Sequence, residues 1–353
     1  MEKNRICFLS DFCYCEKDIK KKELLIKNYL SLKDDHEIEW NDNNPDYLFV
    51  NETFYYGKYS AKLRKMYNRI IKCNPVTIFV AGECIEPDFN VFDYAIVFDR
   101  NLKLENRVIR YPTFLRFRKS IFEKENKMTL EDAKKELNQK KYFCNFIYSN
   151  SMAHINRDKL FHEITKYKPV NSLGKHLNNF KINDEKIDSI SDWRLQSIKL
   201  KGLHKFSIAS ENAAYNGYVS EKLITSLESH SIPIYFGDQT VNEEFNEKAF
   251  INFKLGDDWN ELLERIKKID NDDELWCKMI CEPWQTEEQR IKSENEITNY
   301  YNFIDKLFEK KEFKKAEGFH PSNYRNAFKI WRGNEDKKIK YNRYKSKIKR
   351  LLK

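Results

Sequence analysis

Short apolar runs alternate with amphipathic stretches along most of this 353-residue chain, and this alternation limits the folds it can adopt. An apolar run bounded by polar turns and followed by a helical period is typical of βαβ units around a parallel sheet. In the first part of the chain, the expected strands are Arg5–Ser10, Tyr47–Asn51, Val76–Ala81, Tyr94–Asp99 and Arg107–Tyr111, and the expected helices include Lys20–Leu32 and Ser60–Ile71.

A second series of the same kind follows a lysine- and glutamate-rich connecting helix, expected at about Leu130 to Lys140. Its expected strands are Phe143–Ser149, Lys205–Ala209, Ile232–Phe236 and Ala249–Phe253, and its expected helices include Asn156–Tyr167, Glu221–His230 and Trp259–Ile269. We therefore expect an α/β protein with two Rossmann-like, doubly wound domains facing a cleft, over residues 1–140 and 141–310. Ligands of such sheets bind beyond the carboxyl ends of the strands.

The net charge of +9 suggests a nucleic-acid partner, but its distribution argues against one. Nine basic residues and no acidic ones lie between Lys337 and Lys353, so the rest of the chain is close to neutral. Charge collected in a tail does not make a basic binding face. Residues 311–353 are expected to be helical, and one helical face would carry Tyr341, Tyr344, Ile348, Leu351 and Leu352. Two interpretations stay open for this tail, peripheral contact with an anionic membrane and a solvated lysine-rich segment.

Nothing in the sequence indicates export, disulfide bonding or a metal site. No apolar run approaches the roughly 18 residues of a membrane-spanning helix, and Ile6–Leu9 is too short for a secretory signal. We therefore expect a cytoplasmic chain whose eight cysteines, which lack repeated C-x-x-C spacing, are reduced thiols. The seven histidines form no i,i+4 pair, and we expect Asp270-Asn271-Asp272 to begin a helix. Accordingly, no metal and no cofactor are expected.

The stretch His204–Gly237 contains the pattern strand, polar loop, helix and strand. Ser220 is a good N-cap, and Glu221 and Lys222 fall in the first helical turn. The unpaired N–H groups and the positive dipole end of that turn favour a bound anion, such as a diphosphate. On these residues alone, an ordinary capped helix with a solvated Glu-Lys pair is an equally open interpretation.

Glu83 follows the expected strand Val76–Ala81, where active-site residues of α/β domains gather. A carboxylate in this place can take a proton from an incoming hydroxyl group. From its spacing alone, Glu83 could equally be a surface loop residue.

Three blocks of sequence together resemble the α-1,3-fucosyltransferases that use GDP-fucose, glycosyltransferase family 10. The donor-binding motif of that family matches Glu211-Asn212, Tyr218-Val219-Ser220-Glu221-Lys222 and Pro233-Ile234-Tyr235-Phe236-Gly237. The second block is Gly82-Glu83 with Asn90-Val91-Phe92-Asp93-Tyr94-Ala95-Ile96-Val97-Phe98-Asp99, and the third is Phe143-Cys144-Asn145-Phe146-Ile147-Tyr148-Ser149-Asn150 with Arg157. Ser210 departs from the usual phenylalanine, and Leu173 departs from a common glycine.

The resemblance implies a GT-B-type glycosyltransferase. It would invert the anomeric centre while transferring L-fucose from GDP-β-L-fucose to a glycan hydroxyl, with O3 of N-acetylglucosamine the expected acceptor as in Lewis-type antigens. Glu83 inherits the role of catalytic base by position. The donor-binding residues it implies are Glu221, Lys222, Tyr218, Asn212, Lys141, Ser149 and Asn150. Lys141, with Lys140, stands where the family often has a basic residue before the third block.

Three other functions remain as alternatives. A transferase of the same fold could use another GDP-sugar, because Glu221, Lys222 and the phosphate contacts would recognise parts common to all sugar nucleotides. A nucleic-acid-binding protein that uses the basic tail would bind independently of Glu83 and Lys222. A non-catalytic glycan-binding module would keep its ligand affinity without Glu83.

Overall fold

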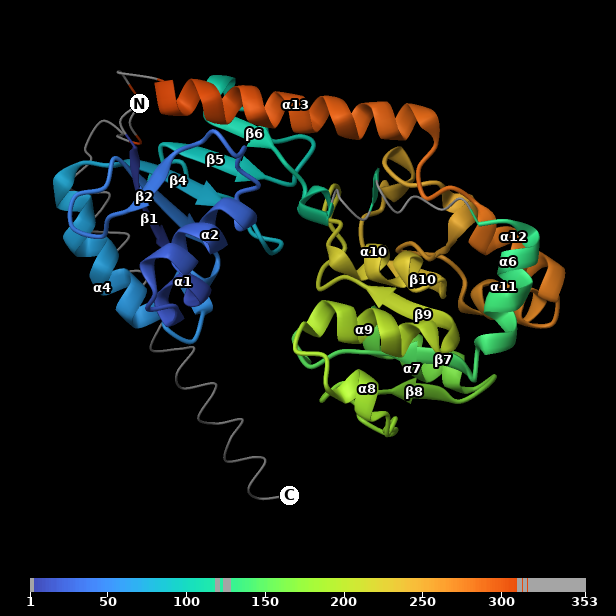
Figure 1. Ribbon diagram of the computed structural model, residues 1–353. Helices are drawn as coiled ribbons and strands as arrows, with labels where there is room; N and C mark the ends of the chain where they lie inside the picture. Colours follow the sequence, from blue (N-terminus) through green and yellow to red (C-terminus); the bar gives the residue numbers. More distant parts are fainter. Residues whose placement is uncertain (1–2, 118–120, 123–127, 310–312, 314–315, 317–353) are drawn as a thin grey trace.

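The computed structural model describes residues 3–117, 121–122, 128–309, 313 and 316, and it contains two parallel β-sheets. The first sheet has six strands in the order β2-β1-β3-β4-β5-β6 (Figure 1). Its strands are β1 (Asn4–Leu9), β2 (Ile38–Trp40), β3 (Tyr47–Asn51), β4 (Val76–Val80), β5 (Tyr94–Val97) and β6 (Val108–Arg110). The five strands predicted here are confirmed, and the three-residue strand β2 was not predicted.

The second sheet has five parallel strands in the order β11-β10-β9-β7-β8. Its strands are β7 (Tyr142–Phe146), β8 (Val170–Ser172), β9 (His204–Ser210), β10 (Ile232–Phe236) and β11 (Ile251–Asn252). Strand β8 was not predicted, and its pairing with β7 supplies the hydrogen bonds that hold so short a segment extended. The prediction of two doubly wound α/β domains is confirmed.

Helices cover both faces of each sheet, as the buried strands require. In β1, Ile6 and Phe8 pack into one apolar cluster and Cys7 and Leu9 into another, because alternate side chains point to opposite faces. The first domain carries α1 (Asp11–Cys15), α2 (Ile19–Tyr29), α3 (Thr53–Tyr56) and α4 (Ser60–Ile70). The second carries α7 (Asn156–Thr165), α8 (Glu185–Asp188), α9 (Trp193–Gly202), α10 (Glu221–Glu228), α11 (Trp259–Asp270) and α12 (Asp273–Cys281).

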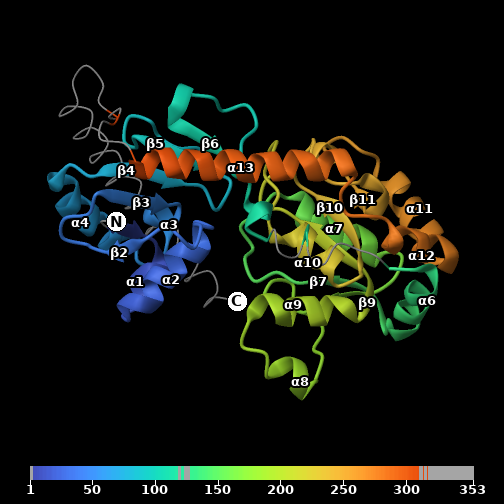
Figure 2. The same ribbon diagram turned by 45° about the horizontal axis from the view of Figure 1, so that its top comes forward.

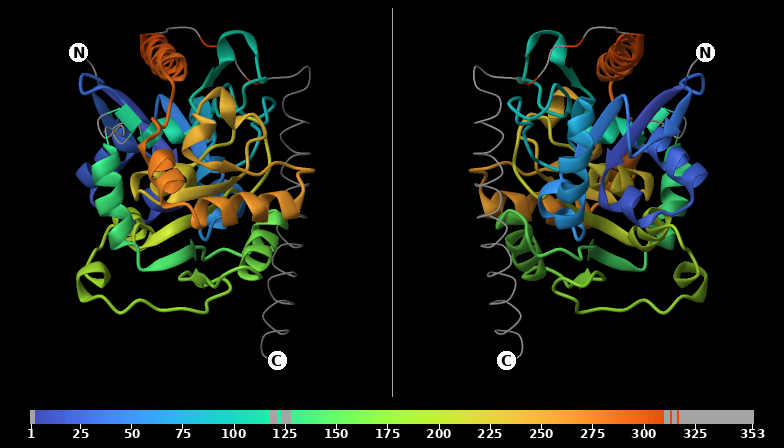
Figure 3. Two further views of the ribbon diagram at one scale, coloured as in Figure 1. Left: turned by 90° about the vertical axis from the view of Figure 1, so that its right-hand side faces the viewer. Right: turned by 90° about the vertical axis from the view of Figure 1, so that its left-hand side faces the viewer.

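Two helices connect the domains in sequence. Helix α6 (Leu130–Gln139) precedes the second sheet and packs on α12, with Ala133 in the core of that domain. Helix α13 (Glu287–Glu309) leaves the second domain and runs back along β6 of the first (Figures 1 and 2; nearly end-on at the top of Figure 3). Tyr300 of α13 joins the core of the first domain, where its hydroxyl group donates to the Leu30 carbonyl. The domain boundaries expected at residues 140 and 310 stay predictions. They assign α6 to the first domain and α13 to the second, whereas α6 packs on the second domain and α13 packs on the first.

Several smaller predictions concern single segments. All eight cysteines lie within the described residues and none is disulfide-bonded there. Asp272 accepts a hydrogen bond from the Leu275 N–H and so begins α12, which confirms its capping role. Within the described part of the chain, no helix is long and apolar enough to cross a membrane. The predicted tail helix, with its membrane contact, falls almost entirely outside the described residues.

A buried ionic network ties the two domains together. Arg100, which follows β5, places Nη2 2.9 Å from a carboxylate oxygen of both Asp238 and Glu244 in the second domain. Arg110 of β6 pairs with the same Glu244 and with Glu296 of α13. Asp238 and Glu244 are at most 2% exposed in their side chains, so both depend on these arginines for compensation of charge.

Arg100→Met is expected to lower the free energy of unfolding by about 3–5 kcal/mol, because it leaves buried carboxylates short of a cation. Denaturant unfolding followed by circular dichroism measures this loss. Arg69→Met is the matched control, since Arg69 pairs with Asp42 at the exposed surface and should contribute at most about 1 kcal/mol. Equal losses in the two variants would show that the Arg100 network does not stabilise the fold.

Candidate functional site

Glu83 lies in the loop after β4, at the carboxyl edge of the first sheet, as its sequence position predicted. The loop is held by Glu52, whose Oε2 accepts a hydrogen bond from the Gly82 N–H at 2.9 Å. A Cβ at Gly82 would come within 2.5 Å of the Tyr29 hydroxyl oxygen and 2.8 Å of Glu52 Oε1, so any larger residue would displace these side chains. Burial raises the pKa of Glu52. This tight packing fixes the backbone from which Glu83 extends.

Two residues of the second domain donate hydrogen bonds to the Glu83 carboxylate. Its Oε2 accepts hydrogen bonds from Asn212 Nδ2 at 2.8 Å and from the Tyr218 hydroxyl at 2.6 Å. Both residues lie in the loop between β9 and α10, at the carboxyl edge of the second sheet. The carboxyl ends of the two sheets therefore meet at Glu83, and the loop from Asn212 to Tyr218 brings them together.

Arg157 orients the Asn212 amide. Its guanidinium is buried in α7, stacks over the Tyr148 ring at 4.3 Å and donates to the Ser210 carbonyl and to Asn212 Oδ1. Because the amide oxygen is taken by a cation, Nδ2 is the atom turned toward Glu83. The sequence pattern placed Arg157 in the third block, but we did not assign it to the site. The sequence did offer a signal, because Arg157 lies at the start of the helix that follows the expected strand Phe143–Ser149.

Tyr218 is held as firmly as Asn212. Its side chain is 1% exposed and packs edge-on against Phe98 of the first domain, with ring centroids 5.1 Å apart. The preceding Gly217 has φ of +84°, and a Cβ there would lie 2.6 Å from the Phe98 carbonyl oxygen. Burial, followed by the neighbouring carboxylates of Glu211 and Glu83, raises the pKa of Tyr218, so the hydroxyl stays protonated and donates to Glu83. We expected Tyr218 to line the donor pocket; the structure places its ring in the core against Phe98 and its hydroxyl on Glu83, and its contact with a donor stays a prediction.

The start of α10 carries a cluster of charges. Lys222 Nζ lies 3.2 Å from Glu211 Oε2, 3.2 Å from Glu221 Oε1 and 3.0 Å from Ser220 Oγ. Glu211 is fully buried and accepts from both the Ser220 N–H and the Ser220 hydroxyl. Ser220 is the N-cap residue of α10, as expected, but its hydroxyl bonds to Glu211 and makes no cap hydrogen bond to the helix. The N–H groups of the first turn are not taken by that hydroxyl and remain a place for an anion.

The ionisation of this cluster follows from its burial and from Lys222. Burial raises the pKa of Glu211, against the opposing charge of Lys222. Burial also disfavours the charged form of Glu221, but the Lys222 ammonium and the hydrogen bonds that Glu221 accepts hold its pKa below the usual value. Burial would lower the pKa of Lys222, yet the carboxylates of Glu211 and Glu221 raise it above its usual value. Lys222 is therefore a fixed cation at the start of α10. Glu211, like Arg157, was quoted in the sequence motif but not assigned to the site.

The remaining predicted site residues, Ser149, Asn150 and Lys141, lie at opposite ends of strand β7. Ser149 and Asn150 follow β7 and are exposed at its carboxyl edge, where the Asn150 carbonyl accepts from Arg157. Lys141 precedes β7 and therefore lies at the opposite, amino edge, where its N–H bonds to the Leu203 carbonyl. Lys140 beside it is buried against Glu136 and the Gly202 carbonyl. The structure corrects the predicted phosphate contact of Lys141, because the length of β7 separates it from the start of α10.

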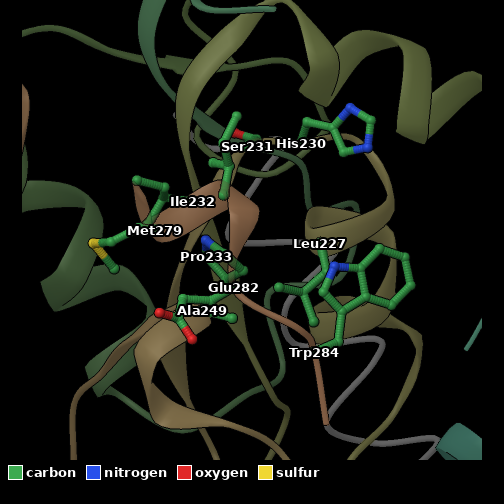
Figure 4. A pocket seen from close by; sticks show the side chains of 10 residues that line it. Leu227, His230, Ser231, Ile232, Pro233, Ala249, Met279, Glu282 and Trp284 are labelled. Atoms are coloured by element: carbon green, nitrogen blue, oxygen red, sulfur yellow. The ribbon is translucent and has the colours of Figure 1, made fainter. Parts of the chain in front are cut away.

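Two further observations limit where a ligand could sit. The pocket drawn in Figure 4 lies at the amino end of β10, beside Ser231, Pro233 and Trp284, and its volume of about 10 Å³ is no more than a water molecule needs. It is on the wrong edge of the sheet and too small for a sugar nucleotide. Among the described residues, no three histidine, cysteine, aspartate or glutamate side chains gather as they would around a metal ion.

Comparisons with known proteins agree with the fold. The family model described as glycosyltransferase family 10 (fucosyltransferase) C-terminal matches residues 137–317, and the model of the α-(1,3)-fucosyltransferase FucT N-terminal domain matches residues 10–117. Two crystal structures of an α1,3-fucosyltransferase have the same fold. One is of the protein alone (TM-score 0.64, 22% identity, 90% of this chain and 95% of that one). The other contains GDP-fucose (TM-score 0.62, 21% identity, 89% and 92%).

Two relatives match a large part of the sequence. A protein of Acanthamoeba polyphaga mimivirus that is provisionally named a fucosyltransferase is 30% identical over 248 residues, 68% of this chain and 38% of its own length. The α-(1,3)-fucosyltransferase FucT of Helicobacter pylori is 28% identical over 237 residues, 59% of this chain and 47% of its own. This chain therefore aligns with less than half the length of these two relatives. With Glu83, Glu221 and Lys222 inside the matched regions and the GT-B-type fold around them, the chain belongs to glycosyltransferase family 10, the fucosyltransferases.

Proposed function

We propose that this protein transfers L-fucose from GDP-β-L-fucose to a glycan hydroxyl, O3 of N-acetylglucosamine, with inversion at the anomeric carbon. The observation that carries the proposal is that Glu83 is hydrogen-bonded by Asn212 and Tyr218, which lie in the loop that leads into α10. The loop that holds this carboxylate runs directly into the helix start that carries Lys222. A base on one side and an anion site on the other are what an inverting transfer from a sugar diphosphate needs.

In the proposed reaction, Glu83 takes up the proton and the start of α10 stabilises the negative charge of the diphosphate. As the acceptor oxygen bonds to the anomeric carbon, its proton passes to Glu83, and the bond from the anomeric carbon to the diphosphate oxygen breaks. The electron pair of that bond leaves with GDP. Lys222 and the N–H groups of the first turn of α10 stabilise this growing negative charge. No step calls for a metal ion, so we propose that the transfer proceeds without one.

The test is incubation of the purified chain with GDP-fucose and N-acetyllactosamine, with and without EDTA, followed by mass spectrometry. We expect a product heavier by one fucose in both arms. A panel of other GDP-sugars in competition with GDP-fucose separates fucose from a different donor sugar. Product only without EDTA would show that a metal is needed. Neither transfer nor donor hydrolysis, together with no binding of GDP, would refute the proposed function.

A further inference from the structure

A lysine lies buried behind the start of α10. Lys201, in the last turn of α9, is 6% exposed. Its Nζ donates to Thr225 Oγ1 at 2.6 Å and to Ser226 Oγ at 3.1 Å, and lies 3.5 Å from the Lys222 carbonyl oxygen. All three contacts are in the first two turns of α10. They are hydroxyl and carbonyl groups, so they solvate the ammonium without neutralising it.

The surroundings of Lys201 differ from those of the other buried lysine in this domain. Lys140 Nζ has a carboxylate oxygen of Glu136 at 2.7 Å. Among the described residues, no carboxylate forms an ion pair with Lys201. The charged groups that face it at longer range are Glu221 and Lys222 of α10, Glu211 after β9, and Arg194 of α9. Burial lowers the pKa of Lys201 to about 7. A buried cation without a partner costs stability, so its presence calls for a function.

The charge balance at the domain interface indicates that function. Of the charged groups linked through Asn212 and Lys222, three are carboxylates (Glu83, Glu211 and Glu221) and two are cations (Lys222 and Arg157). A diphosphate that arrives there would meet an excess of negative charge. Protonated Lys201 restores the balance from behind the helix.

We propose that Lys201 is a positioning residue of the donor site, whose buried ammonium supplies the positive charge that lets the start of α10 receive the diphosphate of a sugar nucleotide. This inference rests on the proposed function, because it takes α10 as the donor site. Lys201 acts through α10 and does not touch the donor. Since the bound diphosphate favours the charged lysine, donor binding raises the pKa of Lys201 and takes up a proton.

The affinity for the donor should therefore fall as the pH rises. Below pH 7 Lys201 is already protonated and binding is tightest, whereas above pH 7 binding must first charge the lysine. GDP-fucose is the appropriate probe, because its phosphates keep a constant charge over this range. A terminal phosphate such as that of GDP titrates near pH 6, which is about the usual second pKa of a phosphate group. Isothermal titration calorimetry at pH 6.5 and 8.5 should show about tenfold weaker binding to the parent at the higher pH.

Lys201→Met removes the charge and keeps most of the side-chain volume. The variant should bind GDP-fucose about tenfold more weakly than the parent at pH 6.5, with less than about a twofold change up to pH 8.5. Lys199→Met, an exposed lysine of the same helix, is the matched control and should behave as the parent. The Met variant should fold, since it loses a destabilising buried charge. Its resistance to denaturant should exceed that of the parent at pH 6, and the difference should shrink as the pH rises above 7.

A second measurement counts the protons taken up when the donor binds. Titration of the parent with GDP-fucose at pH 7.5 in buffers of different ionisation enthalpy should report proton uptake, and the Lys201→Met variant should show less. Equal affinity and equal pH dependence in the parent and the Met variant would overturn the role of Lys201 while leaving the donor site in place. No binding of GDP-fucose to the parent would overturn the proposed function and this inference together.

Discussion

Glu83→Gln is expected to lower the turnover number for fucosyl transfer by about 10²–10⁴-fold, the usual contribution of a positioned base. The carboxylate would no longer accept the acceptor proton, but the amide oxygen of glutamine can still receive the hydrogen bonds of Asn212 and Tyr218. The loop should therefore keep its place, and GDP-fucose should bind within a few-fold of the parent. Initial rates at saturating donor, together with calorimetry of donor binding, measure the two effects separately.

Glu86→Gln is the matched control for this experiment. Glu86 is an exposed residue of the same loop and accepts a hydrogen bond from Tyr215, so the same chemical change is made a few residues away. We expect its turnover to stay within a few-fold of the parent. If Glu83→Gln kept the turnover of the parent, Glu83 would not be the base. If it lost donor binding as well, its role would be to hold the two domains together.

Lys222→Met is expected to reduce turnover by about 10²–10³-fold, which corresponds to about 2.7–4 kcal/mol of transition-state stabilisation. Lys222 is the fixed cation at the start of α10, and the negative charge on the departing diphosphate is greater in the transition state than in the bound donor. The same substitution has a structural effect, because it leaves the buried Glu211 without its partner at 3.2 Å. Loss of one member of a buried pair usually costs about 3–5 kcal/mol of stability.

The double variant Lys222→Met with Glu211→Gln separates these effects. A neutral amide at position 211 needs no cation, so the double variant should regain much of the stability that the single variant loses. Its turnover should stay low, since the cation is still missing. In the single variant, stability should recover as the pH falls, because burial raises the pKa of Glu211 and the folded state then keeps it protonated. Recovery of turnover in the double variant would show that Lys222 serves only to neutralise Glu211.

Much of the fold could be predicted from local pattern. Strands buried on both faces are nearly continuous apolar runs, as in Tyr47–Asn51 and Val76–Val80, and they stand out between polar turns. Strands β2 and β8 have three residues each and lie among polar residues, so no apolar run marks them. They are extended because a neighbouring strand in the sheet bonds to them, and sequence does not name that neighbour. The same holds for α13, whose packing on the first domain depends on contacts with residues far away in the chain.

The candidate site shows the same division. The chemistry of Glu83, Glu221 and Lys222 was readable from their types and from their positions after a strand or at a helix start. Lys141 was misplaced because nearness in sequence to β7 does not tell which edge of the sheet a residue faces. Arg157 was overlooked because its role depends on Asn212, 55 residues further along the chain.

By itself, the sequence determined the elements, the parallel α/β architecture and the residue types able to do acid-base and anion-binding chemistry. These properties follow from local periodicity and side-chain chemistry, which every short window of the chain carries. Only the tertiary structure decided which charges meet. Asn212 and Tyr218 donate hydrogen bonds to Glu83, and the Ser220 hydroxyl donates to Glu211. Lys201 is buried against α10. Contacts of this kind join distant segments, and their energies depend on burial and on partners that no local window contains.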